Sequence, residues 1–425
     1  MEKAGSSEPA FFKKWRNQMS QVSSKRIQIT NQLYPAYYAQ FSCIADRCQN
    51  NCCYGWKISF GKKDYLKIKR APKSDDLERL TEQAMRRLPD GQRTEERYGE
   101  FAAQKGPCPY QNENGFCRLQ MECGETVLPK VCKEFPRIHA YTPMGWEKNL
   151  STACEAVVEL LWELPQGIDF IEEPLPKEQW RSCSDDFWNR CFISMRGTVI
   201  DILQARQFPL SERLMILGIA LENVKNTWDQ FDLNRWQRRV QLLLSDTSLT
   251  QTLQQFTGDL TKFMAQNTRI ALMMEENEIF IKGQTKKIKA SWHIVPKEQG
   301  LEISMEYDEN HYKECKTRFQ NYFGDIEYFF ENILVNTAFW QRVPNVSSPQ
   351  EMWKGYVVLC GIYSYFRFIS VLFCGEDPTK EKLMQAIVVA SRGLLHNTNR
   401  RSSLGEQFFD THNDTLAHMA ILVKE

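Results

Sequence analysis

The sequence predicts a mainly α-helical protein, in which a cysteine-rich metal-binding N-terminal region packs on a helical C-terminal domain with a small β-hairpin element. Nine of the 14 cysteines lie between Cys43 and Cys154, helical spacing dominates after about residue 166, and 42% of the 425 residues are hydrophobic. This length allows two or three domains with buried cores. We therefore divide the chain into a polar, locally basic extension (1–30), a cysteine-rich metal-binding region (31–165) and a mainly helical domain (166–425).

Two elements and one turn are predicted within the cysteine-rich region. A charged helix should run from Asp64 to Leu88, with Leu77, Leu80 and Met85 on one face. Asn114-Gly115 is typical of a tight turn, which would bring Cys108 and Cys117 near each other. A second helix should run from Ser151 to Leu164, with its inner face formed by Cys154, Val157, Val158 and Leu161.

The helical domain has clear start signals and one pair of predicted strands. Leu214, Leu217, Leu221 and Val224 recur at helical spacing. Ser348-Pro349-Gln350-Glu351 is a capping box with proline at the first helical position, and another helix should begin at Asp377-Pro378. Residues 279–281 and 288–303 have the pattern of strands, which would form a small hairpin pair.

Charge and the N-terminal sequence bear on partners and location. The formal net charge is +1, so we expect no nucleic-acid partner, because phosphate binding needs a positive excess. Residues 1–9 contain no apolar run typical of a signal peptide, so we expect a cytoplasmic protein. The apolar stretch from Gly355 to Cys374 contains Arg367 and is of marginal length, which favours a buried helix over a membrane span.

The cysteine spacings favour a metal site ligated only by thiolates. Thiols stay reduced in the cytosol, so a cluster there indicates metal binding or catalysis more than disulfides. No Cys-x2-Cys pair typical of zinc sites is present, and His139 is the one histidine among these cysteines. An iron–sulfur centre is therefore our first interpretation and zinc the second. Cys48-x3-Cys52 begins the pattern of radical S-adenosylmethionine enzymes, but Gly55 occupies the third ligand position.

Eight cysteines are the candidate metal ligands, enough for two four-thiolate sites or for one site with spare thiols. They are Cys43, Cys48, Cys52, Cys53, Cys108, Cys117, Cys132 and Cys154. Cys48 and Cys52 would share a face if their segment were helical. Cys123 is a weaker candidate. The remaining five lie in helical patterns, where buried small apolar residues are the simpler interpretation; they are Cys183, Cys191, Cys315, Cys360 and Cys374.

These motifs resemble those of a known family. The chain contains Cys43-x4-Cys48-x3-Cys52-Cys53-x-Gly-Trp, then Cys108-Pro … Asn-Gly-x-Cys117, Leu-Pro-x-x-Cys132-x-x-Phe-Pro-Arg and Ser-x-x-Cys154-Glu. In this it resembles the bacterial flagellin lysine N-methylases, the FliB family, which are similar to a broader group of zinc- or iron-chelating cysteine-rich domains. The resemblance extends from about Tyr34 toward the C-terminus, and its specific motifs all lie in 43–155.

The resemblance implies methyl transfer from S-adenosylmethionine to lysine ε-amines of flagellin, with a [4Fe-4S] cluster at the cysteine-rich segment and zinc as the alternative metal. The substrate would be an unassembled flagellin monomer, because a cytosolic enzyme meets flagellin before export. The match leaves open which four cysteines hold the cluster. Cys43, Cys48, Cys52 and Cys53 come first because they are closest in sequence.

Residues for the methyl-transfer chemistry are less well defined than the thiols. The chain has no Gly-x-Gly-x-x-Gly, so no Rossmann-like cofactor site is indicated. A sulfonium favours aromatic faces, and the rings nearest the cysteines are those of Tyr37, Tyr38, Tyr54, Trp56, Tyr110 and Tyr141. A neutral lysine needs a base or an orienting oxygen. The acids in the right region are Glu122, Glu125, Glu134 and Glu155.

Glu155 and Tyr54 are the catalytic candidates we would test first, although core packing and solvated or capping acids are the simpler interpretation for each such residue. Two other functions remain open. One is a non-catalytic zinc- or iron-binding helical interaction protein. The other is a redox enzyme, against which the missing flavin and nicotinamide motifs count.

Overall fold

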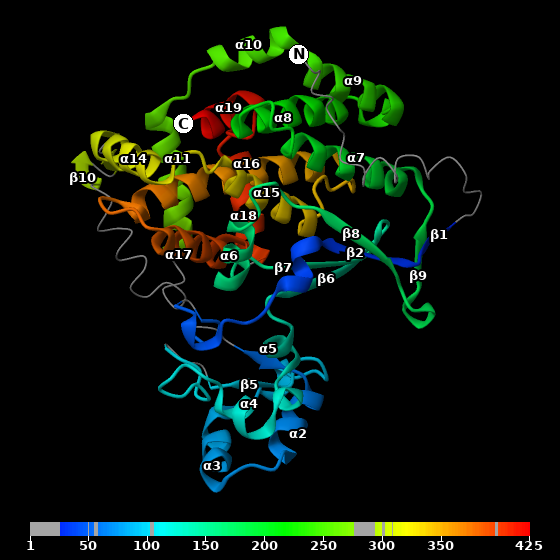
Figure 1. Ribbon diagram of the computed structural model, residues 1–425, viewed down its shortest axis with the longest axis vertical. Coiled ribbons are helices and arrows are strands. Elements are labelled where there is room, and N and C mark those ends of the chain that lie inside the picture. The colour runs from blue at the N-terminus through cyan, green and yellow to red at the C-terminus, as the bar shows by residue number, and fades with distance from the viewer. Residues whose placement is uncertain are drawn as a thin grey trace.

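A computed structural model describes residues 26–49, 51–54, 58–102, 106–275, 294–299, 302–307, 309–395 and 398–425. Most of these residues form a large helical body, and a small lobe lies below it in Figure 1. The body helices after residue 186 are α7 (Phe187–Leu203), α8 (Leu210–Asn226), α9 (Leu233–Ser245), α10 (Thr247–Gln255), α11 (Leu260–Glu275), α14 (Glu309–Phe323), α15 (Glu327–Trp340), α16 (Pro349–Cys374), α17 (Lys380–Ala390), α18 (Thr398–Asp410) and α19 (Leu416–Lys424). The predicted helical character is confirmed.

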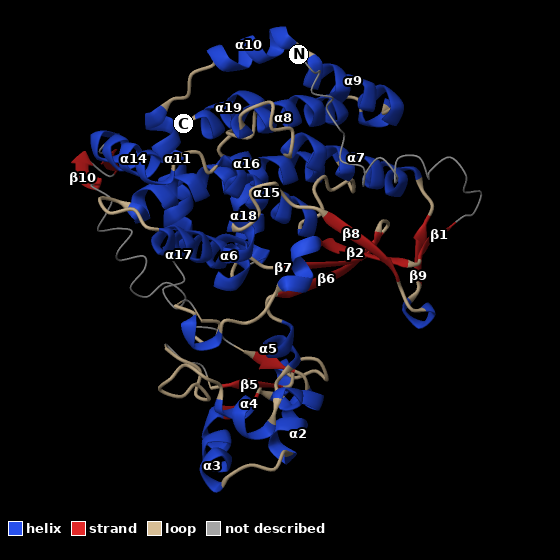
Figure 2. Ribbon diagram, in the orientation of Figure 1, coloured by secondary structure: helices blue, strands red, loops and turns tan. Residues whose placement is uncertain are grey.

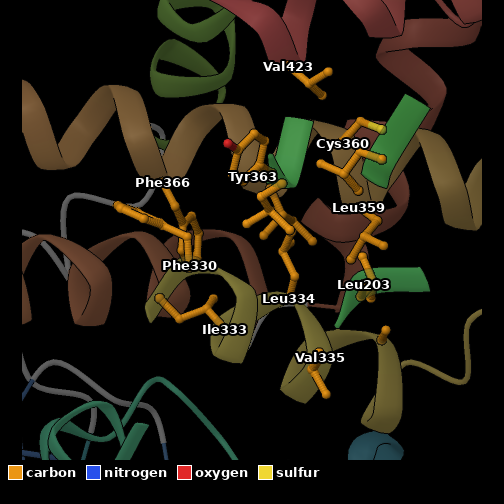
Figure 3. Packing of buried hydrophobic residues seen from close by; sticks show 14 of the residues in the cluster. Leu203, Phe330, Ile333, Leu334, Val335, Leu359, Cys360, Tyr363, Phe366 and Val423 are labelled. Atoms are coloured by element: carbon orange, nitrogen blue, oxygen red, sulfur yellow. The ribbon is translucent and has the colours of Figure 1, made fainter. Parts of the chain in front are cut away.

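Helix α16 is the centre of the body. Its capping box is formed as predicted at the serine end, where Ser348 Oγ accepts a hydrogen bond from the Glu351 amide at 3.1 Å. Rings and aliphatic chains from α16 meet those of α15, as Figure 3 shows for Phe366 and Phe330. By length and composition α16 is the one helix among the described residues able to cross a membrane, but 89% of its most apolar window is buried inside the protein. The prediction of a buried helix is confirmed.

Other predicted helices in the body are present with shifted ends. Helix α8 buries Leu214, Leu217, Leu221 and Val224 completely. Helix α17 begins at Lys380, after the N-cap Thr379, rather than at Asp377-Pro378. Helix α6 (Glu155–Trp162) is shorter than predicted, because Cys154 is its N-cap.

A small hairpin is present, formed by β10 (Ile294–Gln299) and β11 (Glu302–Tyr307). The predicted strand 288–303 is therefore not one strand, because it overlaps both strands of this hairpin. Residues 279–281 and 288–293 lie outside the described residues.

A four-stranded sheet joins the cysteine-rich region to the body. Its order is β6 (Arg137–Thr142), β7 (Gly145–Leu150), β2 (Asn31–Pro35) and β8 (Phe170–Pro174), with β2 and β7 parallel and the other pairs antiparallel. A separate pair joins β1 (Arg26–Ile29) to β9 (Arg181–Ser184). Leu33 and Leu150 point into the main core, so residues on both sides of position 165 share it. We did not predict these strands, because their polar residues weaken the period-two pattern.

The small lobe has its own fold and core. Its elements are β3 (Ser59–Phe60), α2 (Lys62–Arg70), α3 (Asp75–Ala84), β4 (Met85–Arg87), β5 (Gly99–Phe101), α4 (Arg118–Cys123) and α5 (Lys130–Glu134), with the strands ordered β3-β5-β4. The predicted single helix over 64–88 is therefore wrong. Pro72 cannot continue a helix, Ser74 caps the start of α3, and Met85 already belongs to a strand.

Candidate functional site at a thiol-rich junction

The eight candidate cysteines gather where the small lobe meets the helical body. Cys43, Cys48, Cys52 and Cys53 lie on the loop after β2, whereas Cys108 and Cys117 belong to the lobe. Cys132 lies on α5, and Cys154 precedes α6. In Figure 1, α5 is the lobe helix nearest the body, and α6 and α17 form the lower side of the body facing it. Segments distant in sequence thus meet at one junction.

Cys52 is the hub of this thiol cluster. It interacts electrostatically with Cys108, Cys117 and Cys132 from the lobe. It also interacts electrostatically with Cys154 on the body side, and Cys154 interacts electrostatically with Cys43. A single loop thiol therefore lies within electrostatic range of both halves of the junction.

The lobe half of the cluster is held by backbone hydrogen bonds. The amide of Cys108 donates to the carbonyl of Cys53 at 2.6 Å. A further bridge pairs Gln111 with Cys117 around a tight turn, in which Gly115 has a φ of +84°. The predicted Asn-Gly turn is confirmed. It brings Cys117 close enough to Cys108 for the two thiols to interact electrostatically.

The body half is built on the first turn of α6. Glu155 is the first helical residue and is only 7% exposed. Its Oε2 accepts a weak hydrogen bond from the Cys48 thiol, with 3.7 Å between sulfur and oxygen. A carboxylate at a helix N-terminus is favoured by the helix dipole. Glu155 is therefore a buried carboxylate at the edge of the thiol cluster.

Arg392 reaches the same place from the other end of the chain. It lies on the π-helical turn Ser391–Leu395 that continues α17. Its Nε donates to the carbonyl of Ala153 at 3.0 Å, and Nη1 approaches the carbonyl of Asn51 at 3.5 Å. The guanidinium interacts electrostatically with Cys48, Cys52, Cys154 and Glu155. A half-buried cation thus lies beside the most densely clustered thiols.

The surroundings shift the thiol pKa values in opposite directions. A hydrogen bond from Cys53 and the nearby Arg392 lower the pKa of Cys52 to about 7, although burial opposes this. Burial raises the pKa of Cys108 to about 11 and that of Cys154 to about 12. Cys52 is therefore more readily deprotonated than Cys108 and Cys154, and these two half-buried thiols need a positive centre to become thiolates.

The eight candidate cysteines have the right chemistry for a thiolate-ligated metal centre, but their thiols are not arranged around a common metal position. All fourteen cysteines are free thiols. In the part of the chain that the structure describes, no group of three or more histidine, cysteine, aspartate or glutamate residues could hold a metal ion as placed. Among the described residues of the loop that carries Cys48 and Cys52, only Ala45–Arg47 forms a helical turn, and this turn is of the 3-10 type. The helix that would place Cys48 and Cys52 on one face is therefore not observed. Metal ligation by the eight cysteines stays a prediction.

The structure separates the aromatic candidates from one another. Tyr37 and Tyr110 are core residues with about 1% exposure. Tyr38 lies on the 3-10 helix Ala36–Gln40 and its hydroxyl bonds His139 of β6, whereas Tyr141 lies on β6 itself and donates to the carbonyl of Gln179. Tyr54 follows Cys53 and is 38% exposed, which keeps its ring available beside the thiols. Trp56 lies outside the described residues.

Among the acidic candidates, Glu155 differs from the other three by burial. Glu122 is exposed and binds Ser74 and Arg118 within the lobe. Glu125 is exposed on a 3-10 turn, and Glu134 is half-buried and pairs with Lys130. These contacts give Glu122 and Glu134 ordinary structural roles, and Glu125 differs from Glu155 by its exposure.

Most of the remaining cysteines are core residues. Cys191, Cys315, Cys360 and Cys374 are buried, as predicted. Cys183 differs, because it lies half-buried in strand β9 rather than in a helix. Cys123 ends α4, and its thiol donates to the carbonyl of Pro72 at 3.3 Å.

Comparison with known proteins identifies the family. The FliB lysine N-methylase C-terminal domain matches residues 196–422, more than half of the chain. The chain belongs to the FliB family. This FliB-type domain begins within α7, ends within α19, and contains the π-helical turn that carries Arg392.

Two relatives illustrate this membership. A lysine-N-methylase of Salmonella typhimurium is 28% identical over 163 residues, which cover 37% of this chain and 38% of the relative. The flagellar biosynthetic protein FliU of Salmonella muenchen is 30% identical over 154 residues, covering 35% of this chain and 85% of the relative. The match thus spans well under half of the lysine-N-methylase. No solved structure matches the chain.

Sequence reasoning missed Arg392. It lies 239 residues after Ala153, the residue whose carbonyl it binds. The run Ser391-Arg392-Gly393 contains no motif that would single it out. Only packing of α17 against α6 places the guanidinium at the cluster.

Proposed function

We propose that this chain is a lysine N-methyltransferase that uses S-adenosylmethionine to methylate lysine ε-amines of unassembled flagellin in the cytoplasm. Membership of the FliB family supports the proposal most directly. The names of the Salmonella relatives supply the lysine and flagellar connections. The thiol junction is consistent with such chemistry, because it combines a buried carboxylate, a cation and an exposed tyrosine.

A thiolate-ligated iron–sulfur cluster, or zinc as the alternative, belongs to the same proposal. The candidate ligands are Cys52 and the seven other candidate cysteines, which come from four chain segments. When bound, such a centre would supply positive charge that keeps buried thiols deprotonated and fixes these segments together. We assign it no step in the methyl transfer.

S-adenosylmethionine supplies an electrophilic methyl group, and the target lysine must offer a neutral amine with a free lone pair. Glu155 is the residue placed to accept the proton that the amine loses, or to orient the amine. Its low exposure strengthens its electrostatic effect on a neighbouring amine. The half-exposed ring of Tyr54 offers a face for a cationic group beside Cys53.

The decisive experiment incubates anaerobically purified protein with monomeric flagellin and S-adenosylmethionine and measures methyl additions on lysines by mass spectrometry. We expect additions with the wild type. Glu155→Gln should lower kcat by about 100-fold or more, the usual contribution of a positioned proton acceptor. Glu159→Gln, half-buried one turn further along α6, is the matched control and should stay close to wild type.

Iron and acid-labile sulfide are measured in the same samples, so that loss of the centre is separated from loss of Glu155. Cys48→Ser and Cys52→Ser should lose both the metal and the activity. A metal-loaded wild type that methylates no lysine would refute the proposed reaction and favour the non-catalytic metal-binding protein. Full activity in both cysteine variants would refute the thiolate centre.

A further inference from the structure

We propose that Arg392 is the contribution of the FliB-type domain to the metal site: a fixed cation that ties two cysteine-bearing segments together and compensates the negative charge of a thiolate-ligated centre. The inference rests on the thiolate centre of the proposed function, and it adds a residue from outside the cysteine-rich region.

The guanidinium of Arg392 contacts the backbone of two cysteine-bearing segments. Ala153, whose carbonyl accepts from Nε, directly precedes Cys154, and Asn51, whose carbonyl faces Nη1, directly precedes Cys52. One planar group therefore reaches the backbone beside two candidate ligands on different segments. Arginine suits this task because its donors form a rigid fork and its charge is permanent.

The element that presents Arg392 is also fixed to both segments. Ser391 Oγ bonds Thr152 Oγ1 at 2.9 Å, two residues before Cys154. Gln385 on α17 contacts Gln49, the residue after Cys48. The turn itself is π-helical, a geometry that is frequent at functional sites. Two side chains that precede Arg392, those of Gln385 and Ser391, thus bind residues close to candidate ligands.

The positive charge of Arg392 also suits a position beside a thiolate-ligated centre. Four thiolates around zinc or an iron–sulfur cluster form a net anion, and removing part of an anion from water without a counter-charge is costly. Cys48 and Cys154 are half-buried, whereas Cys52 is exposed. Arg392 is a cation in electrostatic contact with Cys48, Cys52 and Cys154. Glu155 lies in the same neighbourhood and adds negative charge, so compensation is needed there even more.

The test measures zinc affinity of the full chain by chelator competition, and iron and sulfide content after anaerobic reconstitution. Arg392→Met should bind zinc about 10- to 100-fold more weakly, as for lost supporting partners of other metal sites. Arg392→Lys keeps the charge and should recover part of that loss. Arg206→Met is the control, since it removes another guanidinium of the same domain, one bound to Glu331.

Equal zinc affinity and equal cluster content in Arg392→Met and wild type would overturn the role of Arg392 while leaving the centre in place. So would a lysine variant no better than the methionine variant, or an equal loss in Arg206→Met. A wild type that holds neither zinc nor a cluster would instead overturn the centre itself, and the inference with it.

Discussion

The helical body and the small lobe differ in how much core each has. The body core runs continuously from the four-stranded sheet through α7, α8, α15 and α16 to α19. The lobe core comprises ten buried residues, and three partly buried cysteines pack against it: Cys108, Cys117 and Cys123. Small cores stabilise a fold only marginally and usually need a metal, a disulfide or a partner. We therefore expect the body to be stabilised mainly by apolar burial and the lobe to depend more on its thiols.

The largest expected effect compares matched phenylalanines in the two cores. Phe366 on α16 is 1% exposed and Phe101 on β5 is 5% exposed. Phe366→Ala should lower the free energy of unfolding of the whole chain by about 3–5 kcal/mol, because it leaves a cavity. Phe101→Ala should open the lobe alone, seen as lost amide protection there in hydrogen exchange with the body unchanged. Equal global losses in both variants would show that lobe and body unfold as one unit.

Metal removal should give the next effect and should act on one region only. A ligand at 100 times its Kd stabilises the state that binds it by about 2.7 kcal/mol. We therefore expect a chelator to lower protection of lobe amides by that amount while body amides keep theirs. Hydrogen exchange with and without zinc measures it. Equal protection of the lobe in both states would contradict its dependence on the thiols.

The smallest expected effect concerns acid. Burial raises the pKa of Asp64, but hydrogen bonds from the Lys130 amide and Lys67 outweigh it, and the pKa lies below the usual 3.8. A lowered folded-state pKa adds stability above pH 4 that is lost as pH falls through the folded value. Asp64→Asn weakens the hydrogen bond between α2 and α5 and should lower the free energy of unfolding by about 1 kcal/mol near pH 7. It should also make the stability of the lobe less dependent on pH in acid.

Lobe protection followed from pH 7 to pH 2 tests the acid prediction, with exposed Glu82→Gln on α3 as control. If the Asp64 variant lost lobe protection in acid as steeply as the wild type, other carboxylates would be responsible for that loss of stability.

Local chemistry made several features predictable. Leu214 and its partners repeat at helical spacing, Ser348 caps α16, and Asn-Gly closes the turn before Cys117. Each depends on residues close in sequence, so the pattern carries the information. The prediction of one helix over 64–88 was wrong because Pro72 and Ser74 divide this segment into two helices, a local signal that we gave too little weight. Strand β2 was not predicted because it pairs with β7 and β8, which are distant in the chain. The local hairpin β6–β7 was not predicted because its polar residues weaken the period-two pattern.

The sequence by itself determined the thiol inventory, the helical class and the resemblance to the FliB family. It also ranked Glu155 first among the four candidate acids, because Glu155 follows Cys154. Tertiary structure decided that Glu155 is buried beside Cys48 and that Cys52 lies between lobe and body. It alone brought Arg392 to the cluster. The physical reason is that burial and electrostatic neighbourhood depend on segments distant in the chain, which spacing does not encode.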